Sequence, residues 1–481
     1  MPASATAARK SKSMSLDAAS QCLLDITVEE DDEKYIPIYS SISTDEGGTM
    51  KTQSQSDGDS RVPDRKDRKY IQKVIRELQQ VKEWHGSSDA VLEDEPFYHG
   101  YMARTESERV LTKNGEFLLR KAEVRGKECY IVSVQWGDKK LHLKIQKVNK
   151  FFFLNVYCFI SVENLIRYHM ALKAPVYEDV ILKSYVVREQ WQLYHEQVHI
   201  DSSIGHGAFG EVFKGTLTVG VFTRPIEVAI KTLKSGNFST DDRITFLREA
   251  NVMLKLQHKY VVRLYGVATQ KEPIMIVMEL ATGGSLLNKV RKEEVDLSRK
   301  RKYCFQTICG MQYLEQQNVM HRDLAARNCL IGVNDTCKIS DFGLSLMGHS
   351  HKEKHLLKVP IRWLAPETMI RGLYSNKSDV WSCGVLMFEV FSNGEVPYKH
   401  ISKLSEVRRE VIFGSLRLKP PRDMPPEDAG IMLSCFENNP LSRPSFDDLK
   451  RAYKSSCGVG KLQRMMGWFA ADKAEIAPVK T

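Results

Sequence analysis

The chain has 481 residues, a formal net charge of +10 and 42% hydrophobic residues, which is enough for roughly two to four domains with proper cores. Its cysteines are scattered without a Cys-x-x-Cys pair, so we expect no disulfide framework and a reducing compartment. No apolar run approaches the ~20 residues of a membrane helix. The N-terminus lacks an apolar signal core, and Pro2 stands where N-myristoylation needs glycine. We therefore expect a cytoplasmic protein with no transmembrane segment.

The charge is distributed unevenly along the chain. Residues 1–60 carry a net charge of −6, and the remainder carries +16. A basic body suits phosphate-bearing or acidic partners, such as a nucleotide, a phosphopeptide or an anionic membrane surface. We expect no nucleic-acid partner, because the sequence has neither zinc-finger spacing nor an aromatic RNA-binding motif.

The N-terminal part is expected to form little structure. Residues 1–63 are rich in Ser, Thr, Asp and Gly, which predicts a disordered acidic region. Within it, Tyr35 and Tyr39 follow a run of acids, so this stretch is either a solvated acidic tail or a tyrosine phosphorylation site. Residues 64–95 have helical spacing of apolar residues over two heptads at most, which predicts a short helical segment and a linker.

Two folded domains are predicted after residue 95, both of the α+β class. Residues 96–188 contain three strand-like runs, with a helical pattern before and after them. A linker, 189–197, leads to residues 198–456, which begin rich in strands and end rich in helices, as expected for two lobes. Residues 457–481 form a C-terminal tail to which we assign no role.

A glycine-rich segment at 205–212, GHGAFGEV, lies between two predicted strands. Glycines let backbone amides approach phosphates, but this motif alone is weak evidence, because glycines mark many turns. Lys231 ends an apolar run about twenty residues later, so we expect its ammonium inside a cleft, as a contact to α- and β-phosphates. Glu249, in a following helical pattern, is its predicted carboxylate partner.

The segment VMHRDLAARNCLI (319–331) carries the most specific chemistry in the chain. Asp323 can accept the proton of a hydroxyl group, and Asn328 can ligate a metal. Asp341, in KISDFGLS, is a hard oxygen ligand suited to Mg²⁺. Taken together and in this order, these residues predict phosphoryl transfer that uses ATP and Mg²⁺.

The large domain resembles the protein kinases. HRDLAARN (321–328) and PIRWLAPE (360–367) are similar to the forms found in tyrosine kinases. The resemblance implies a catalytic set of Asp323, Arg327, Lys231 and Glu249, in which Arg327 replaces the lysine of serine/threonine kinases and steadies the transferred charge.

The same resemblance implies two structural roles and an ATP site. Glu367 is expected to pair with Arg443, and Asp379 to brace the catalytic loop. Met278 is expected behind the adenine, with the backbone of the next residues along its edge. The implied ATP-binding residues are Ile204, Gly205, Gly207, Gly210, Val212, Ala229, Lys231, Met278, Glu279, Ala281 and Leu330.

The smaller domain resembles a Src-homology 2 (SH2) domain, which implies a central antiparallel sheet flanked by two helices. FLLRKA (117–122) is similar to the family's Phe-Leu-Val-Arg-Glu-Ser strand. Arg120 is therefore the expected bidentate phosphate ligand. Lys121 and Ala122 depart from the family pattern and remove a hydroxyl from the phosphate loop, which changes the expected affinity. The implied phosphotyrosine-binding residues are Arg104, Arg120, His142 and Lys144.

One further position of the SH2-like domain bears on specificity. Leu143 follows His142 directly. We expect it to line an apolar site that reads residues C-terminal to the phosphotyrosine.

An SH2-like domain placed directly before a tyrosine-kinase-like domain resembles the Fes/Fer group. Its members carry an F-BAR and coiled-coil region, whereas this sequence has about 90 residues before the SH2-like part, so membrane-curvature sensing is not inferred. We expect a non-receptor protein-tyrosine kinase whose SH2 domain targets it to tyrosine-phosphorylated proteins. This binding is expected to activate the kinase and, through such partners, to recruit it to the plasma membrane. The alternative is an SH2 adaptor whose kinase fold is a weakly active scaffold, and the PIRW motif disfavours dual specificity.

The stretch 341–367 contains no tyrosine, although tyrosine kinases of this kind usually phosphorylate one there. By resemblance, Arg322 is the residue that pairs with that phosphate. We therefore expect another group to take the place of the phosphate beside Arg322. Glu353 could act as a fixed carboxylate, Ser345 or Ser350 could be phosphorylated by another kinase, or SH2 binding to phosphotyrosine could order the loop. We favour the third explanation combined with the first.

Overall fold

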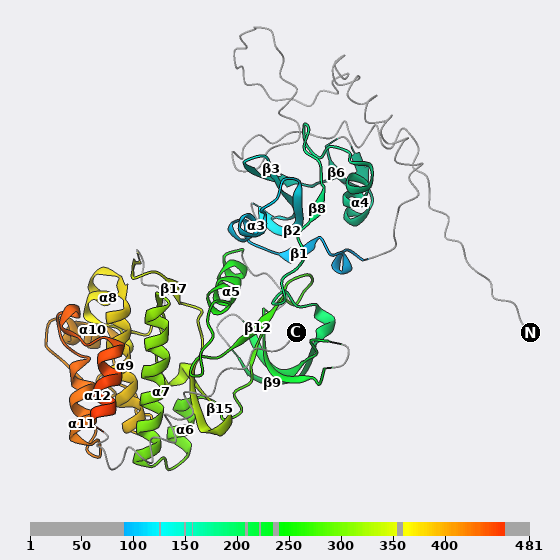
Figure 1. The fold of residues 1–481 in the computed structure, drawn as a ribbon. Coiled ribbons are helices and arrows are strands. Elements are labelled where there is room, and N and C mark those ends of the chain that lie inside the picture. The colour runs from blue at the N-terminus through cyan, green and yellow to red at the C-terminus, as the bar shows by residue number, and fades with distance from the viewer. Residues whose placement is uncertain are drawn as a thin grey trace, which may run out of the picture. The chain divides into compact units, whose positions relative to one another are not determined.

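The computed structural model describes residues 91–456, apart from 125–126, 149–150, 156, 207–209, 221–222, 234–239 and 354–358. The predicted acidic region, the N-terminal helical segment and the C-terminal tail lie outside the described residues. The described chain forms two compact units (Figure 1). One contains 91–192 and Thr269–Lys271, and the other contains Leu193–Ala268 and 272–456.

The first unit is built on a sheet whose strand order is β1-β2-β3-β4, with β8 also pairing β2. The strands β2, β3 and β4 are antiparallel, whereas β1 and β8 run parallel to β2. Helices α3 and α4 lie on opposite sides of this sheet in Figure 1. The elements are η1 (Leu92–Asp94), β1 (Tyr98–Tyr101), α3 (Arg104–Val110), β2 (Glu116–Val124), β3 (Lys127–Trp136), β4 (Lys139–Lys144), β5 (Gln146–Val148), β6 (Phe151–Leu154), β7 (Tyr157–Phe159), α4 (Val162–Leu172) and β8 (Ser184–Tyr185).

The core of this unit forms where α4 meets the sheet. Ser161 begins the helix by accepting a hydrogen bond from the Asn164 amide (3.3 Å), which is the usual capping role of serine. Leu165 and Ile166 on α4 are fully buried in one cluster with Leu119 of β2. The third strand-like run of this domain, residues 140–148, forms two strands. The chain leaves β4 at the buried Ile145, and β5 then pairs with β6 in a separate sheet.

The second unit begins with an antiparallel five-stranded sheet in the order β12-β13-β11-β10-β9, followed along the chain by helices and short strand pairs. Its sheet and first helix are β9 (Val198–His206) after η2 (His195–Gln197), β10 (Gly210–Leu217), β11 (Ile226–Leu233), α5 (Thr240–Met253), β12 (Leu264–Ala268) and β13 (Met275–Glu279). The remaining elements are α6 (Leu286–Lys292), α7 (Leu297–Gln316), β14 (Val319–Met320), η3 (Ala326–Asn328), β15 (Cys329–Gly332), η4 (Val333–Asp335), β16 (Thr336–Ile339), β17 (Leu346–Met347), β18 (Ser350–Lys352), η5 (Ile361–Trp363), α8 (Pro366–Arg371), β19 (Leu373–Ser375), α9 (Asn376–Phe391), α10 (Leu404–Ile412), α11 (Pro426–Ser434), η6 (Pro440–Ser442) and α12 (Phe446–Ser456).

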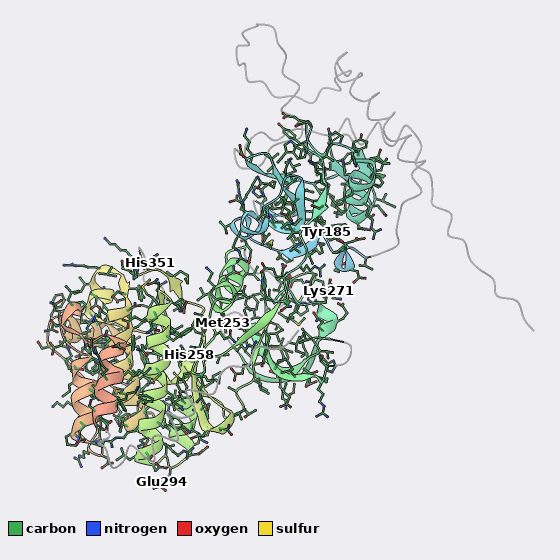
Figure 2. The ribbon with its side chains drawn as sticks, viewed as in Figure 1. Tyr185, Met253, His258, Lys271, Glu294 and His351 are labelled. Atoms are coloured by element: carbon green, nitrogen blue, oxygen red, sulfur yellow. The ribbon has the colours of Figure 1, made fainter. Side chains whose placement is uncertain are left out.

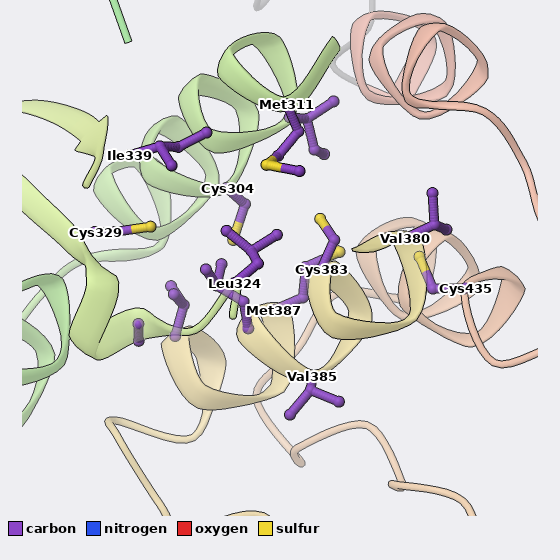
Figure 3. Packing of buried hydrophobic residues seen from close by; sticks show 14 of the residues in the cluster. Cys304, Met311, Leu324, Cys329, Ile339, Val380, Cys383, Val385, Met387 and Cys435 are labelled. Carbon is purple, nitrogen blue, oxygen red and sulfur yellow. The ribbon is translucent and has the colours of Figure 1, made fainter. Parts of the chain in front are cut away.

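The helical part is organised around α9, which is buried along most of its length. A helix that is apolar all round belongs in the centre of a domain rather than at its surface. Figure 3 shows Cys383 and Met387 of α9 packed near Cys304 of α7 and Leu324, which follows β14. The short strand pairs that carry the chemistry, the β15–β16 hairpin and the more distant pairs β14–β17 and β18–β19, are antiparallel.

None of the helices in the described ranges is both long enough and apolar enough to cross a membrane.

Candidate active site

Lys231 and Glu249 form a buried ion pair in the second unit. Lys231 lies near the end of β11, its Nζ donates to Glu249 Oε2 on α5 (2.6 Å), and both residues are more than nine-tenths buried. Burial raises the pKa of Glu249, Lys231 opposes this, and the nearby carboxylate of Asp341 adds to it. The pair holds the ammonium of Lys231 at a defined place inside the unit, as the sequence predicted.

Asp323 lies at the centre of the catalytic loop. Its Oδ1 accepts from Arg327 Nη2, and its Oδ2 accepts from Asn328 Nδ2 (2.8 Å). Burial raises the pKa of Asp323 to about 6, and Asp341 adds to the shift, although Arg327 and Asn328 oppose it. A carboxyl group with a pKa near 6 is largely ionised at pH 7 and is still basic enough to take up a proton.

The backbone of this loop is held by one buried carboxylate. Asp379, on α9, accepts hydrogen bonds from the amides of His321 (2.8 Å) and Arg322 (2.9 Å), which confirms the predicted brace. Arg322 has a φ of 70°, a conformation that is unfavourable for a residue with a side chain. Asp379 therefore stabilises the strained turn that precedes Asp323.

Asn328 and Asp341 come together through the β15–β16 hairpin. Cys329 pairs with Ile339, and the amide and hydroxyl of Ser340 both donate to the Asn328 carbonyl (2.9 Å each). Because the side-chain nitrogen of Asn328 donates to Asp323, its side-chain oxygen is left for a cation. Together with the exposed carboxylate of Asp341, this makes a pair of hard oxygen donors, which fits a hard divalent cation when substrate phosphates and water complete the shell.

The predicted ATP-binding residues lie on the sheet and on the segments beside it. Ala229 pairs with Met278 across β11 and β13, and Val212 pairs with Gly205 across β10 and β9. A Cβ atom on Gly205 would meet open space, which leaves room for a ligand. A Cβ atom on Gly210 would lie 1.7 Å from Thr232 O, so the close approach of β10 to β11 already requires that glycine.

The remaining members of this set lie nearby or outside the description. Leu330 is on β15, Ile204 is half exposed on β9, and Glu279 ends β13. Ala281 follows β13 and is partly exposed. Gly207 lies outside the described residues.

Glu389 is a contributor to this site that the sequence reasoning missed. Its Oε2 accepts from the amide of Ala326 (2.9 Å) and from Trp363 Nε1 (3.1 Å). Trp363 in turn carries the guanidinium of Arg327 over its ring, 4.6 Å from the centroid. The sequence offers one signal for this role. Glu389 is an acid within the apolar run of α9, and a buried carboxylate needs a partner.

Glu367 and Arg443 form the predicted pair. Two parallel hydrogen bonds join them, of 2.7 and 2.8 Å, and the side chain of Arg443 is completely buried. A bidentate pair of this kind fixes the start of α8, directly after the PIRW segment.

In the first unit, the predicted phosphotyrosine residues come from α3, β2 and β4. Arg120 is 1% exposed, and its Nε donates to Ser133 Oγ (3.0 Å). That hydroxyl lies 2.9 Å from His142 Nδ1, so Ser133, which the sequence reasoning did not single out, links the two. Burial and Arg120 lower the pKa of His142 to about 4, which keeps the ring neutral at pH 7.

Glu108 on α3 adds a carboxylate to this cluster of side chains. Its Oε1 accepts from Arg104 Nε (2.7 Å) and lies 3.1 Å from His142 Nε2. Lys144 is partly exposed and pairs in register with Ile131. Arg104 and His142 are thus already engaged by an anion of the protein.

The structure bears on one departure from the family pattern, Lys121, and on the specificity hypothesis for Leu143. Lys121 forms an ion pair with Glu128 (2.7 Å), so this charge is compensated within the domain. Leu143 is fully buried in the core of the first unit. The hypothesis that Leu143 lines a peptide-reading site is therefore wrong for this structure, because alternate residues of β4 face opposite sides of the sheet.

Comparisons with known proteins identify the family of each unit. Residues 198–452 match the model of the protein tyrosine and serine/threonine kinase family, and residues 97–169 match the SH2 domain model. The family implies ATP and a divalent metal as cofactors and proteins as substrates. The SH2 domain implies phosphotyrosine-containing partners.

Relatives were found in several animals. Spermatocyte protein spe-8 of Caenorhabditis elegans is 39% identical over 76% of this chain and 73% of its own length. Fer-related kinase 1 of the same species is 36% identical over 74% of this chain and 92% of its own length. Human tyrosine-protein kinase Fer is 36% identical over 76% of this chain, which spans 44% of Fer. The chain belongs to the protein-tyrosine kinases and is a non-receptor member with an SH2 domain, homologous to the Fer/Fps kinases.

Proposed function

We propose that this kinase transfers the γ-phosphate of ATP to tyrosines of protein substrates, with Mg²⁺ as its metal ion and Asp323 as the group that receives the phenolic proton. The observation that carries the proposal is the position of Asp323, held between Arg327 and Asn328 with a pKa near 6. A base must be oriented as well as basic, and these two contacts fix its orientation.

Lys231 and Glu249 have the role of orienting ATP. The ion pair fixes the ammonium in one position, so that it is preorganised to bind the α- and β-phosphates. The strand residues around it, Ala229 and Met278 among them, supply an apolar surface for the adenine.

Asn328 and Asp341 have the role of metal ligands. When bound, Mg²⁺ neutralises negative charge on the phosphates during transfer. Asn328 also donates to the carboxylate of Asp323 (2.8 Å), so a hydrogen bond joins the metal ligand to the base. Asp341 has a φ of 61°, a backbone conformation that costs energy and is common at functional sites.

Arg327 and Trp363 favour tyrosine over serine. Arg327 reaches Asp323 from four residues away, and its guanidinium lies over the indole ring of Trp363. This arrangement places an apolar ring and a positive charge beside the base. A long phenol can use both, whereas the short side chain of serine does not extend that far from its backbone.

The SH2 domain has the role of bringing the kinase to tyrosine-phosphorylated proteins, including those at the plasma membrane, and of activating it there. The cluster of Arg104, Arg120 and His142 supports phosphotyrosine recognition. Buried free cysteines, such as Cys304 and Cys383, support a reducing, cytoplasmic location.

The test is an assay of the purified full chain with ATP, Mg²⁺ and an acidic tyrosine-containing peptide. Wild type is expected to phosphorylate tyrosine, and Asp323→Asn to lose at least ~10²-fold in kcat. The same peptide with serine in place of tyrosine is expected to remain unmodified. Equal activity of wild type and Asp323→Asn would contradict the proposal, and an inactive wild type would favour the alternative of an SH2 adaptor with a kinase-fold scaffold.

A further inference from the structure

We propose that Glu353 is a positioning residue that takes the place of an activation-loop phosphate, so that the kinase reaches its active loop arrangement without phosphorylation of that loop. The inference rests on the proposed kinase function and concerns how its site is regulated. It joins three observations: the environment of Arg322, the backbone anchoring of Glu353, and the positions of the two serines of the loop.

Arg322 requires an anion where it lies. Only 9% of its side chain is exposed, and its Nη1 donates to Leu344 O (3.2 Å). Its guanidinium carbon lies 4.0 Å from the centroid of the Tyr374 ring. Leu344 O and the Tyr374 ring are neutral, and the Asp379 carboxylate is engaged by the backbone amides of His321 and Arg322. A buried positive charge is costly unless it is paired. Glu353 supplies the pair, because its Oε2 accepts from Arg322 Nη2 (2.9 Å).

The backbone of Glu353 is held in place by contacts that involve no phosphate. The preceding strand β18 pairs with β19, with His351 opposite Tyr374; His351 is labelled in Figure 2. The Glu353 amide then donates to Gly372 O (2.9 Å). A loop that is paired this way presents its side chain at a fixed position, which limits the entropy lost when the ion pair forms.

Gly372 makes this approach possible. It ends α8 with a φ of 66°, and a Cβ atom there would lie 2.2 Å from Glu353 O. Any other residue would therefore push the loop away as well as strain its own backbone. The chain thus combines a carboxylate opposite Arg322 with the one residue type that allows this carboxylate to approach.

The serine alternatives fit the structure less well. Ser345 is 2% exposed, and its hydroxyl donates to His321 O (3.1 Å), so a kinase cannot reach it in this arrangement. Ser350 is exposed, but it lies three residues before Glu353, in β18. Its phosphorylation is an outcome that the experiment separates from the proposal.

The experiment uses the full chain, treated with a protein phosphatase that is then removed, with mass spectrometry to show that 341–367 carries no phosphate. Wild type is expected to remain active toward a tyrosine peptide. Glu353→Gln keeps the size of the side chain but removes its charge, and it is expected to lower kcat about tenfold while the KM for ATP stays within about twofold. Glu353→Asp is expected to retain more activity than Glu353→Gln. Gly372→Ala is expected to lower kcat as much as Glu353→Gln does.

Hydrogen exchange supplies a measurement that does not depend on activity. The amides of 350–353 and 373–375 are expected to exchange faster in Glu353→Gln than in wild type, because the strand pair loosens. Glu293→Gln is the matched control, since Glu293 is also a partly exposed partner in an ion pair, with Lys289. It is expected to match wild type in both measurements. Thermal unfolding of each variant shows whether a loss of activity comes from misfolding. If Glu353→Gln misfolds, the activity of Glu353→Asp and its exchange rates decide whether the carboxylate is needed.

Three results would overturn the proposal. The first is a Glu353→Gln variant with kcat within twofold of wild type and unchanged exchange. The second is a dephosphorylated wild type that is inactive until Ser350 is phosphorylated, with Ser350→Ala inactive throughout. The third is a phosphotyrosine peptide that brings Glu353→Gln to the same kcat as wild type, because Glu353 is then not needed for the active arrangement. If wild type shows no tyrosine transfer at all, the proposed function fails instead, and unchanged exchange in Glu353→Gln then decides against the role of Glu353.

Discussion

The guanidinium of Arg327 lies over the indole ring of Trp363, 4.6 Å from its centroid, while its Nη2 donates to Asp323. The two residues come from segments that are 36 positions apart in the sequence. The ring thus holds a cation in contact with the base, and a substrate that reaches the base meets all three groups.

Replacement of the ring tests this arrangement. Trp363→Ala is expected to lower kcat/KM for a tyrosine peptide about three- to tenfold, because a cation–π contact contributes ~0.5–2 kcal/mol. Trp363→Phe keeps an aromatic face and is expected to lose less. Steady-state kinetics with saturating ATP measures both, and equal losses in the two variants would show that the ring face is not what matters.

The rate is expected to depend on pH through Asp323. Its pKa is raised to about 6, mainly by burial, and the base works only when it is ionised. The logarithm of kcat/KM should therefore be level above pH 7 and fall with a slope approaching one below pH 6. Burial lowers the pKa of His321, so this ring stays neutral and adds no second limb near pH 6. A profile that stays level down to pH 5 would contradict the assignment of Asp323 as the base.

Phosphopeptide affinity is expected to rise when Glu108 is removed. Its carboxylate occupies Arg104 and lies beside His142, so a phosphate must compete with it and is also repelled by it. Glu108→Gln is expected to bind a phosphotyrosine peptide about three- to tenfold more tightly in a calorimetric titration, whereas Arg120→Lys should weaken binding at least ~10-fold. Weaker binding by Glu108→Gln would show instead that Glu108 holds Arg104 in its binding position.

The Glu367–Arg443 pair is expected to matter for stability. Glu367→Gln leaves the fully buried Arg443 without its charge partner, which should cost about 3–5 kcal/mol in the free energy of unfolding. Arg451→Ala removes an exposed pair with Asp448 and should cost less than about 1 kcal/mol. Calorimetric unfolding of the two variants compares them directly, and equal shifts would contradict the expectation.

The sequence predicted best those features that depend on neighbouring residues. The strand before Lys231 and the loop from His321 to Asn328 follow from local patterns, and so does the pairing of Lys231 with Glu249, 18 residues away. In these segments, periodicity and spacing carry most of the information.

The features that the sequence reasoning missed depend on residues distant in sequence. Glu389 reaches back 63 positions to the amide of Ala326, and nothing in its own helix indicates that partner. Glu108 meets His142 across 34 positions, so its competition with phosphate appears only once α3 lies beside β4. The hypothesis for Leu143 rests on its position next to His142. Successive residues of β4 face opposite sides of the sheet, however, so Leu143 lies in the core.

The thiols around α9 have a practical use. Cys304, Cys383 and Cys435 are buried, and burial raises the pKa of each thiol, so they stay protonated and out of reach of reagents while the domain is folded. Their modification requires the surrounding core to open. The rate at which a thiol reagent labels them therefore reports how often that core opens, and a nucleotide that binds the folded enzyme should slow the labelling in proportion to its affinity, with no added dye and no substitution in the chain.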